Sequence, residues 1–122
     1  MFKVMNEEVV QNSMQIILHA GDARVECQKA LKCLANFELE EAKSHLKVAN
    51  KKIVEAHKVQ TDAISTETNG EKREYSVLFA HAQDTLMTIY SEINIAKQLV
   101  RLTEVIDMRF KTLEEKIGDE ND

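Results

Sequence analysis

The sequence predicts an all-α protein built as an antiparallel three-helix bundle, and three observations lead to this prediction. None of the 122 residues is proline, so the chain is free to form long helices. Apolar residues recur at steps of three and four through three long segments. One convincing break separates the second segment from the third: the polar stretch "STETNGEKRE", whose Asn69-Gly70 pair is a turn signal. Long amphipathic helices with short connections pack as antiparallel bundles.

The first helix is expected from about residue 6 to residue 35. Asn6 is a plausible N-cap, and Glu7 and Glu8 suit the positive end of the helix dipole. Gly21 interrupts the segment at a cost of ~1 kcal/mol relative to alanine, which predicts a kink or local irregularity at "HAGDAR". The expected apolar positions are Val10, Met14, Ile17, Val25 and Leu31.

The second helix shows the more regular pattern. Asn36 can cap it, and the glutamates that follow suit its first turn. Its stripe alternates steps of three and four, which is heptad spacing and favours bundle packing. The small residues of this stripe allow neighbouring helices to approach closely. The stripe consists of Leu39, Ala42, Leu46, Ala49, Ile53, Ala56, Gln60 and Ala63.

The third helix is expected to open at Glu71. Its first stripe is Phe79, Ala82, Leu86, Ile89, Ile93, Ala96 and Val100. Near Lys97 to Arg101 the pattern changes phase, so either the helix turns a corner or a longer helix meets a new neighbour. The second stripe is Leu99, Leu102, Ile106, Leu113 and Ile117.

Length and pattern predict a single domain over residues 1–122, with a core at about 6–100 and a C-terminal extension at 101–122. The last residues, "GDEND", read as frayed and disordered. The third helix is apolar on nearly all sides, and such helices are usually buried on all sides. One three-helix unit cannot bury it, so we expect a symmetric ring of subunits.

Composition excludes several classes of function. The net charge of −5 argues against nucleic-acid binding. No apolar run reaches the ~18 residues of a membrane span, and the start lacks the apolar core of a signal peptide, so we expect a cytoplasmic protein without membrane insertion. Cys27 and Cys33 are six residues apart, which is neither a metal nor a redox spacing, and we expect inert thiols.

The chain offers few catalytic candidates, because it contains no glycine-rich phosphate loop, no Ser-His-Asp order and no paired-cysteine zinc site. Of the four histidines, His45 and His57 lie among lysines and are interpreted as surface residues. His19 is either structural or lines a cleft. His81 differs, because it lies in the most apolar segment, "YSVLFAHAQDTLMTIY".

The simpler interpretation of His81 is a histidine at the margin of a core. Two features favour chemistry instead. His81 and Asp84 share a helix face, and a neutral imidazole is a competent nucleophile toward phosphorus. Asp84 either orients His81 or, near a threefold axis, meets two symmetry-related carboxylates. Three such carboxylates must bind protons or a cation, and oxygen ligands favour Mg²⁺.

Three motifs occur in order along the chain: "AGDAR" at 20–24, "FELEEAKSHLKVANKKIVEAHKVQT" at 37–61 and "HAQDTLMT" at 81–88. Together they resemble the IIA component of the lactose/cellobiose (chitobiose) class of bacterial sugar phosphotransferase systems. The resemblance implies three-helix protomers assembled as a homotrimer. It also implies a phosphotransferase component that takes phosphate from the phosphocarrier HPr on one histidine and passes it to a cysteine of the IIB component. No organic cofactor is implied.

By this resemblance, His81 is the phosphorylated residue and Gln83 is its neighbour at the phosphoryl site. The aspartate that in some members binds a metal at the trimer axis corresponds to Asp84. Many relatives read "HAQDHLMT", whereas this chain has Thr85 in place of the second histidine. Because His81 and Asp84 are both present, we expect phosphoryl transfer to survive this difference.

Two other functions fit a helical chain of this kind. The first is a non-catalytic oligomeric adaptor, in which His81 is only a core residue. The second is a histidine phosphotransfer domain of two-component signalling, which normally uses a four-helix bundle. The clustering of His81, Gln83 and Asp84 within one turn favours the sugar phosphotransferase carrier over both.

Overall fold

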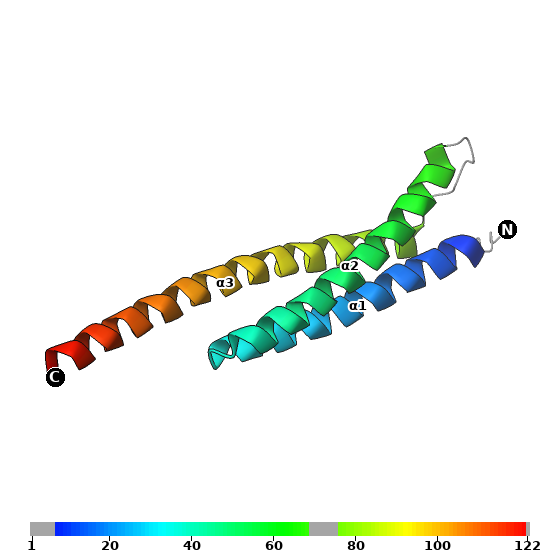
Figure 1. Ribbon diagram of the computed structural model, residues 1–122. Coiled ribbons are helices and arrows are strands. Elements are labelled where there is room, and N and C mark those ends of the chain that lie inside the picture. Colours follow the sequence, from blue (N-terminus) through cyan, green and yellow to red (C-terminus); the bar gives the residue numbers. More distant parts are fainter. Residues whose placement is uncertain (1–6, 69–75, 122) are drawn as a thin grey trace.

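The computed structural model describes residues 7–68 and 76–121, and within these ranges it consists of three helices without a strand. They are α1 (Glu7–Ala35), α2 (Leu39–Thr68) and α3 (Val77–Asn121). The first two form an antiparallel hairpin, and α3 runs back beside them in the direction of α1 (Figure 1). This confirms the all-α, three-helix prediction. The expected cap Asn6, the turn Asn69-Gly70 and the expected start Glu71 lie outside the described residues.

The core is a continuous cluster made largely of small side chains. On α2, every predicted apolar position is buried except Leu39 and Gln60, which are half-buried. On α3, the predicted stripe is buried except for the half-buried Phe79. Alanines let the three backbones approach closely, and isoleucines and leucines fill the remaining space. The core contains Ile16, Ala20, Ala23, Cys27, Ala30, Leu34, Ala42, Leu46, Ala49, Ile53, Ala56, Ala82, Leu86, Ile89, Ile93, Ala96 and Val100.

The predicted apolar stripe of α1 is wrong, because the buried face lies beside it. Met14, Val25 and Leu31 are 45%, 50% and 38% exposed. The face that packs against α2 and α3 has mostly small residues at the same spacing: Val9, Ser13, Ile16, Ala20, Ala23, Cys27, Ala30 and Leu34. Close helix packing selects small side chains, so the larger ones of α1 are left on the outside.

The irregularity expected at Gly21 is also absent, since α1 passes through this residue as continuous helix. Gly21 is half-buried, while Ala20 and Ala23 on either side are completely buried against the neighbouring helices. Tertiary packing of an amphipathic face contributes more to a helix than the propensity of one residue. The packing of the adjacent alanines therefore offsets the local cost of the glycine.

The connection between α1 and α2 is a Schellman motif centred on Phe37. The amide of Glu38 donates to the carbonyl of Cys33 at 2.9 Å, and the amide of Phe37 donates to the carbonyl of Leu34 at 3.0 Å. Phe37 has a φ of 56°, a left-handed conformation that is usually taken by glycine. Asn36 therefore belongs to the end of α1 and does not cap α2. The carbonyl of Glu38 accepts the first helical bond of α2, from Ala42 at 3.0 Å.

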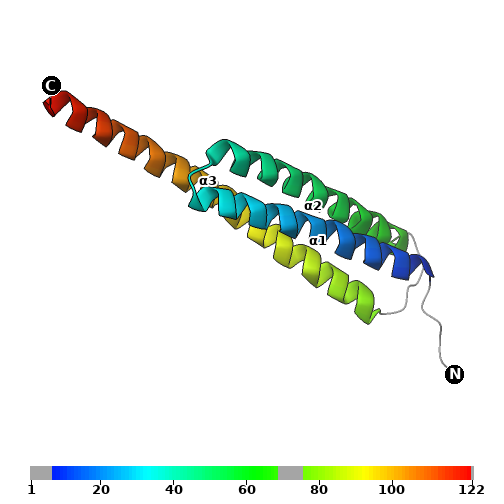
Figure 2. The same ribbon diagram turned by 90° about the horizontal axis from the view of Figure 1, so that it is seen from below.

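Helix α3 is one continuous element of 45 residues, against 29 for α1 and 30 for α2. It does not turn a corner near Lys97 to Arg101, so the first of the two alternatives is wrong. Its last third projects beyond the end of the α1–α2 hairpin (Figure 2). The segment expected to fray is helical through Asn121. Within the described residues, no helix has the length and apolar character needed to cross a membrane.

Half-buried polar contacts fix the register of α1 against α2. The Nδ1 atom of His45 lies 2.8 Å from Oε2 of Glu26, and Nδ1 of His19 lies 3.2 Å from Oε2 of Glu55. The hydrogen bond with His45 holds the pKa of the Glu26 carboxyl below its ordinary value of 4.5, although partial burial opposes this shift. Because the folded-state pKa is lowered, the ionised carboxylate stabilises the fold above pH 4.5. That stability is lost as the pH falls through the folded pKa.

We therefore predict that Glu26→Gln lowers the free energy of unfolding at pH 7 by about 1 kcal/mol, the scale of one intramolecular hydrogen bond. At a second pH, below the folded-state pKa of Glu26, the difference from the parent protein should shrink, because the parent carboxylate is then protonated too. Urea unfolding at both pH values, at one protein concentration, measures this. Glu40→Gln is the control, since Glu40 is 87% exposed and makes only a 3.7 Å contact with Lys43. An equal decrease in the free energy of unfolding at both pH values would contradict the ionic role of Glu26.

Candidate functional site

The candidate site lies at the beginning of α3, where Ser76 caps the helix. The amide of Phe79 donates to the Ser76 hydroxyl at 3.2 Å, and the amide of Ala80 donates to the Ser76 carbonyl at 3.0 Å. These are the two bonds of an N-cap residue. The remaining amides of the first turn give this end of α3 a partial positive charge, which favours anions.

His81 lies in the second turn of α3, five residues after the cap, and its side chain is exposed. Its neighbour Ala82 and, one turn later, Leu86 are completely buried, so core packing determines which way His81 faces. Helical side chains lean toward the helix N-terminus, so a group carried on this imidazole lies over the positively polarised first turn. Thr85 cannot supply a second imidazole. Its hydroxyl donates to the backbone carbonyl of His81 at 2.9 Å.

The other three histidines all have side-chain partners. His19 contacts Glu55 and His45 contacts Glu26, as described above. His57, interpreted from the sequence as a surface residue, is half-buried with its ring edge-on to Tyr90 at 5.2 Å between centroids. Among the described residues, His81 alone of the four histidines is exposed and has no side-chain partner. It is therefore the imidazole most accessible to another protein.

Asp84 is exposed one turn after His81. Neither a hydrogen bond nor an ion pair joins its carboxylate to His81 in the part of the chain described. The same residues contain no cluster of three histidine, cysteine or acidic side chains that could hold a metal ion.

Gln83 is half-buried and follows His81 by two positions. In an α-helix two positions correspond to about 200° around the axis, so the two side chains face nearly opposite directions. A single chain therefore does not bring Gln83 to His81. The assignment of Gln83 to the phosphoryl site stays a prediction that requires a neighbouring subunit.

The apolar surface beside His81 is smaller than the sequence suggests. Val77 is 73% exposed, while Leu78 and Ala80 are half-buried. Phe79 packs against the core and contributes little to the surface. The exposed apolar side chain available for docking at this end of α3 is mainly that of Val77.

Sequence reasoning missed an ion pair that links α1 to α3. The Nε and Nη2 atoms of Arg24 donate to the two carboxylate oxygens of Glu92 at 3.2 and 3.0 Å. Glu92 lies about three turns after His81 on the same side of α3, so this bidentate pair fixes the histidine-bearing face relative to α1. The only sequence signal was the presence of Arg24 in the motif "AGDAR".

The two cysteines are free thiols, and neither is activated. Burial raises the pKa of Cys27 and of Cys33 above the ordinary value, which disfavours the nucleophilic thiolate. This agrees with the expectation that both are chemically inert.

Solved structures of two other proteins are similar to this three-helix fold. The crystal structure of PtcA from S. mutans matches with a TM-score of 0.80 at 28% identity, over 83% of this chain and 99% of that one. The crystal structure of the PTS cellobiose specific enzyme IIA from Bacillus anthracis matches with a TM-score of 0.77 at 33% identity, over 88% of this chain and 95% of that one. The fold thus resembles that of a helical enzyme IIA of a phosphotransferase system.

Sequence relatives narrow this class to one family. The family profile "PTS system, Lactose/Cellobiose specific IIA subunit" matches residues 11–104, so the chain belongs to that family. The lichenan-specific phosphotransferase enzyme IIA component of Bacillus subtilis strain 168 is 38% identical over 102 residues, which are 84% of this chain and 93% of that protein. The lactose-specific EIIA component of Lactococcus lactis subsp. lactis is 36% identical over 79% of this chain and 91% of its own length. Residues 105–122 lie outside the family match.

Proposed function

We propose that this protein is a cytoplasmic phosphoryl carrier that accepts phosphate from phospho-HPr on His81 and passes it to a cysteine of its cognate IIB component. The observation that carries the proposal is the exposure of His81, without a side-chain partner, at the N-terminal end of α3. Membership of the lactose/cellobiose IIA family supports the same role during uptake of a lactose-, cellobiose- or chitobiose-type sugar.

The chemistry is two successive phosphoryl transfers. A ring nitrogen of neutral His81 attacks the phosphorus carried by HPr, the new N–P bond forms, and the bonding pair of the old bond returns to HPr. In the second step the IIB thiolate attacks the phosphorus, an S–P bond forms, and the N–P electron pair returns to the ring nitrogen of His81, so the imidazole is neutral again, as it was before the first step. The partners bring the phosphoryl group, so the carrier needs no organic cofactor.

An exposed position suits a carrier, because HPr and IIB must reach the same nitrogen in turn. The amides of the first turn of α3 stabilise the phosphoryl charge without enclosing it. Such stabilisation is modest near a solvent-exposed helix end, so the group is held and is still released to the next partner. A deep pocket would bind the phosphoryl group more tightly and would slow the second transfer.

We also propose that the protein acts as a homotrimer in which α3 lines the axis. The support is the face of α3 that points away from the core, where Met87, Ile95 and Leu102 are 53%, 59% and 55% exposed. Asp84 lies on this outward face, at the end that carries His81. A helix face this apolar is usually covered by a partner. In a homotrimer the three copies of α3 would cover one another's outward faces.

In such a trimer three Asp84 carboxylates would converge and could hold Mg²⁺ or another divalent cation. The donor set fits a hard cation, because carboxylate oxygens are its preferred ligands and no nitrogen or sulfur ligand is needed. The cation would neutralise charge at the axis and would take no part in phosphoryl transfer. Without it, the three carboxylates repel one another or bind protons.

We predict that His81→Ala abolishes phosphate acceptance when the chain is incubated with phosphoenolpyruvate, enzyme I and HPr. The parent protein should gain acid-labile, alkali-stable phosphate, because an N–P bond has that stability. His45→Ala and His57→Ala are the matched controls and should retain nearly all acceptance, since both imidazoles contact side chains of the bundle. Loss of acceptance in His57→Ala together with an active His81→Ala would overturn the assignment. A parent chain that never gains phosphate would indicate the adaptor function instead.

Asp84→Leu tests the axial arrangement. Exchanging converging charges for apolar residues of similar volume is often neutral or stabilising by about 1–4 kcal/mol. The variant should be a trimer in light scattering, should melt higher than the parent, and should no longer respond to Mg²⁺ or EDTA, while His81 still accepts phosphate. If Asp84 instead orients the imidazole, transfer should fail while melting temperature and metal response stay as in the parent. A monodisperse monomer of the parent at micromolar concentration would contradict the trimer itself.

A further inference from the structure

A shallow hollow between α2 and α3 is lined by three lysines. Lys43, Lys47 and Asn50 come from α2 and Lys97 comes from α3, and the buried side chain of Leu46 completes the lining. Its volume is about 290 Å³, which is near the lower end of the roughly 300–1,000 Å³ of sites for small molecules. The hollow therefore has room for a small organic molecule and not only for a single ion.

Two polar contacts between the helices bound this hollow. The Nζ atom of Lys97 donates to Oδ1 of Asn50 at 2.8 Å, and Nζ of Lys43 lies 2.8 Å from Oε1 of Glu104. The two contacts are seven residues apart on each of the antiparallel helices, which corresponds to about 10 Å. Lys47 lies between them along α2 and has no hydrogen bond or ion pair in the part of the chain that the structure describes. Two lysines are thus held in place, and the third is available to a ligand.

The hollow is basic, although the chain as a whole has a net charge of −5. Residues 43–58 of α2 contain five lysines and one acidic residue, Glu55, which contacts His19 of α1. The carboxylates of Glu104 and of the exposed Glu40 both contact the same lysine of the hollow. The other two lysines contact no carboxylate within residues 7–68 and 76–121. This local excess of positive charge favours an anion.

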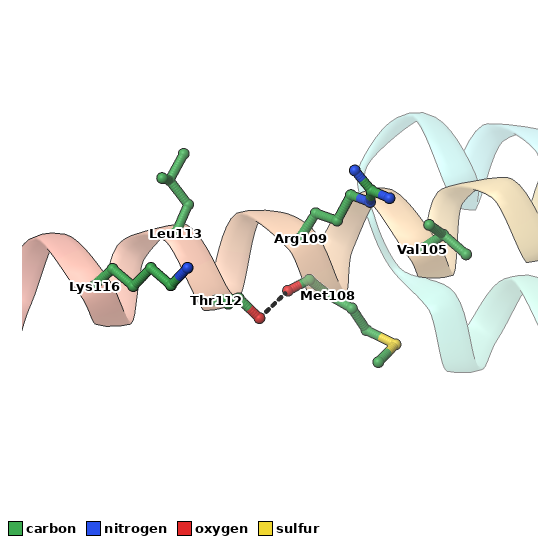
Figure 3. A pocket seen from close by; sticks show the side chains of 6 residues that line it. All are labelled: Val105, Met108, Arg109, Thr112, Leu113 and Lys116. Atoms are coloured by element: carbon green, nitrogen blue, oxygen red, sulfur yellow. Dashed lines mark hydrogen bonds between the residues drawn. The ribbon is translucent and has the colours of Figure 1, made fainter.

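A larger hollow on the projecting part of α3 lacks these features. Figure 3 shows that all six side chains that line it come from α3 alone. The hydroxyl of one of them, Thr112, already donates to the carbonyl of Met108 at 3.0 Å. A ligand would meet only one helix there, whereas the hollow between α2 and α3 offers groups from two helices.

We propose that the hollow between α2 and α3 binds a small phosphate monoester. A phosphoryl group carries close to two negative charges at neutral pH and has three acceptor oxygens, which suit several ammonium donors at once. Lys47 and Lys97 would pair with these oxygens. The amide nitrogen of Asn50 would donate to them, because only its oxygen is used by Lys97. The rest of the ligand would lie against Leu46 and the apolar stems of the lysines.

This site is distinct from the phosphoryl acceptor and from the outward face of α3. Lys97 follows His81 by sixteen residues, which corresponds to about 24 Å along the helix and about 160° around it. Lys97 also follows Ile95 by two residues, or about 200° around the axis, so the hollow is turned away from the face that carries Ile95. The proposal therefore does not depend on the carrier function or on the trimer. A bound ester would link α2 to α3 and would act on the carrier from a distance.

The direct test is an NMR titration of the isotope-labelled full-length protein with glucose 6-phosphate, phosphoenolpyruvate, inorganic phosphate and glucose. Partly exposed ion pairs give affinities on the order of 1 mM, so about 10 mM of an ester should nearly saturate the site. At least one ester should shift the amide signals of Lys47, Asn50 and Lys97 and leave that of His81 unchanged, while glucose shifts none. A preference between the two esters would support the proposal and show whether the ligand is a sugar phosphate or a small phosphorylated acid. Equal binding of inorganic phosphate, an adventitious ion only, would overturn it, and so would no response to either ester.

A charge substitution inside the hollow gives a second measurement. Lys47→Gln should raise the dissociation constant of the bound ester about fivefold, because one partly exposed ion pair is lost. Lys58→Gln is the matched control, since Lys58 is exposed on the same helix, eleven residues further and only about 20° around the axis, but does not line the hollow. The control should bind the ester as the parent does. Equal weakening in both variants would indicate unspecific attraction to lysines and would contradict the site.

Phosphate acceptance by the same proteins separates this proposal from the carrier function. Both lysines are exposed and distant from His81, so both variants should fold and accept phosphate as the parent does. Weaker ester binding in Lys47→Gln with normal phosphate acceptance would support the site. Ester binding by a chain that never gains phosphate would support the site and refute the carrier function.

Discussion

Close packing of small side chains is the constraint on which the rest of this structure depends. Alanines at regular helical intervals on all three helices, with Ser13 and Cys27 on α1, allow the backbones to approach closely, and a limited number of isoleucines and leucines fill the remaining space. Other large apolar residues of α1 and α3 lie on the outside, where Leu18 is 61% exposed and Ile95 is 59% exposed. In such a bundle the apolar side chains of the shared core are buried, whereas apolar side chains on the outer faces stay exposed to solvent. The proposed homotrimer would cover part of these outer faces.

The same packing determines where the candidate phosphoryl acceptor stands. Ala82, Leu86 and Ile89 hold one side of α3 against the hairpin, so His81 is directed outward at the polarised start of the helix. The bidentate pair of Arg24 with Glu92 links the same side of α3 to α1 and favours this orientation. The other three histidines contact groups between helices and contribute to the fold. The helix that carries His81 is thus held firmly on one side, and the imidazole is accessible on the other. The proposed transfer between two protein partners requires both.

Much of this could be predicted from the sequence, for reasons that differ between elements. The buried stripes of α2 and α3 were predictable because they contain isoleucine and leucine at heptad spacing. On α1 the buried face consists mainly of small residues, so the large apolar residues predicted the wrong side of the helix. The start of α2 was misplaced because Phe37, and not a glycine, takes the left-handed position of the turn. His81 and Asp84 were located by their motif. The pair of Arg24 with Glu92, and the separation of Gln83 from His81 within one chain, depend on helix register and rotation, which composition and spacing do not specify.

The central claim is that His81 of the intact protein carries the phosphoryl group, because it alone among the four histidines is exposed and without a side-chain partner in the described structure. Tandem mass spectrometry of the protein without substitutions measures this directly, after phosphorylation by phospho-HPr and with the sample kept at alkaline pH. The expected result is a single phosphate on the peptide that contains "HAQDTLMT", with fragment ions that assign it to His81. Phosphate localised to His19, His45 or His57 would contradict the account.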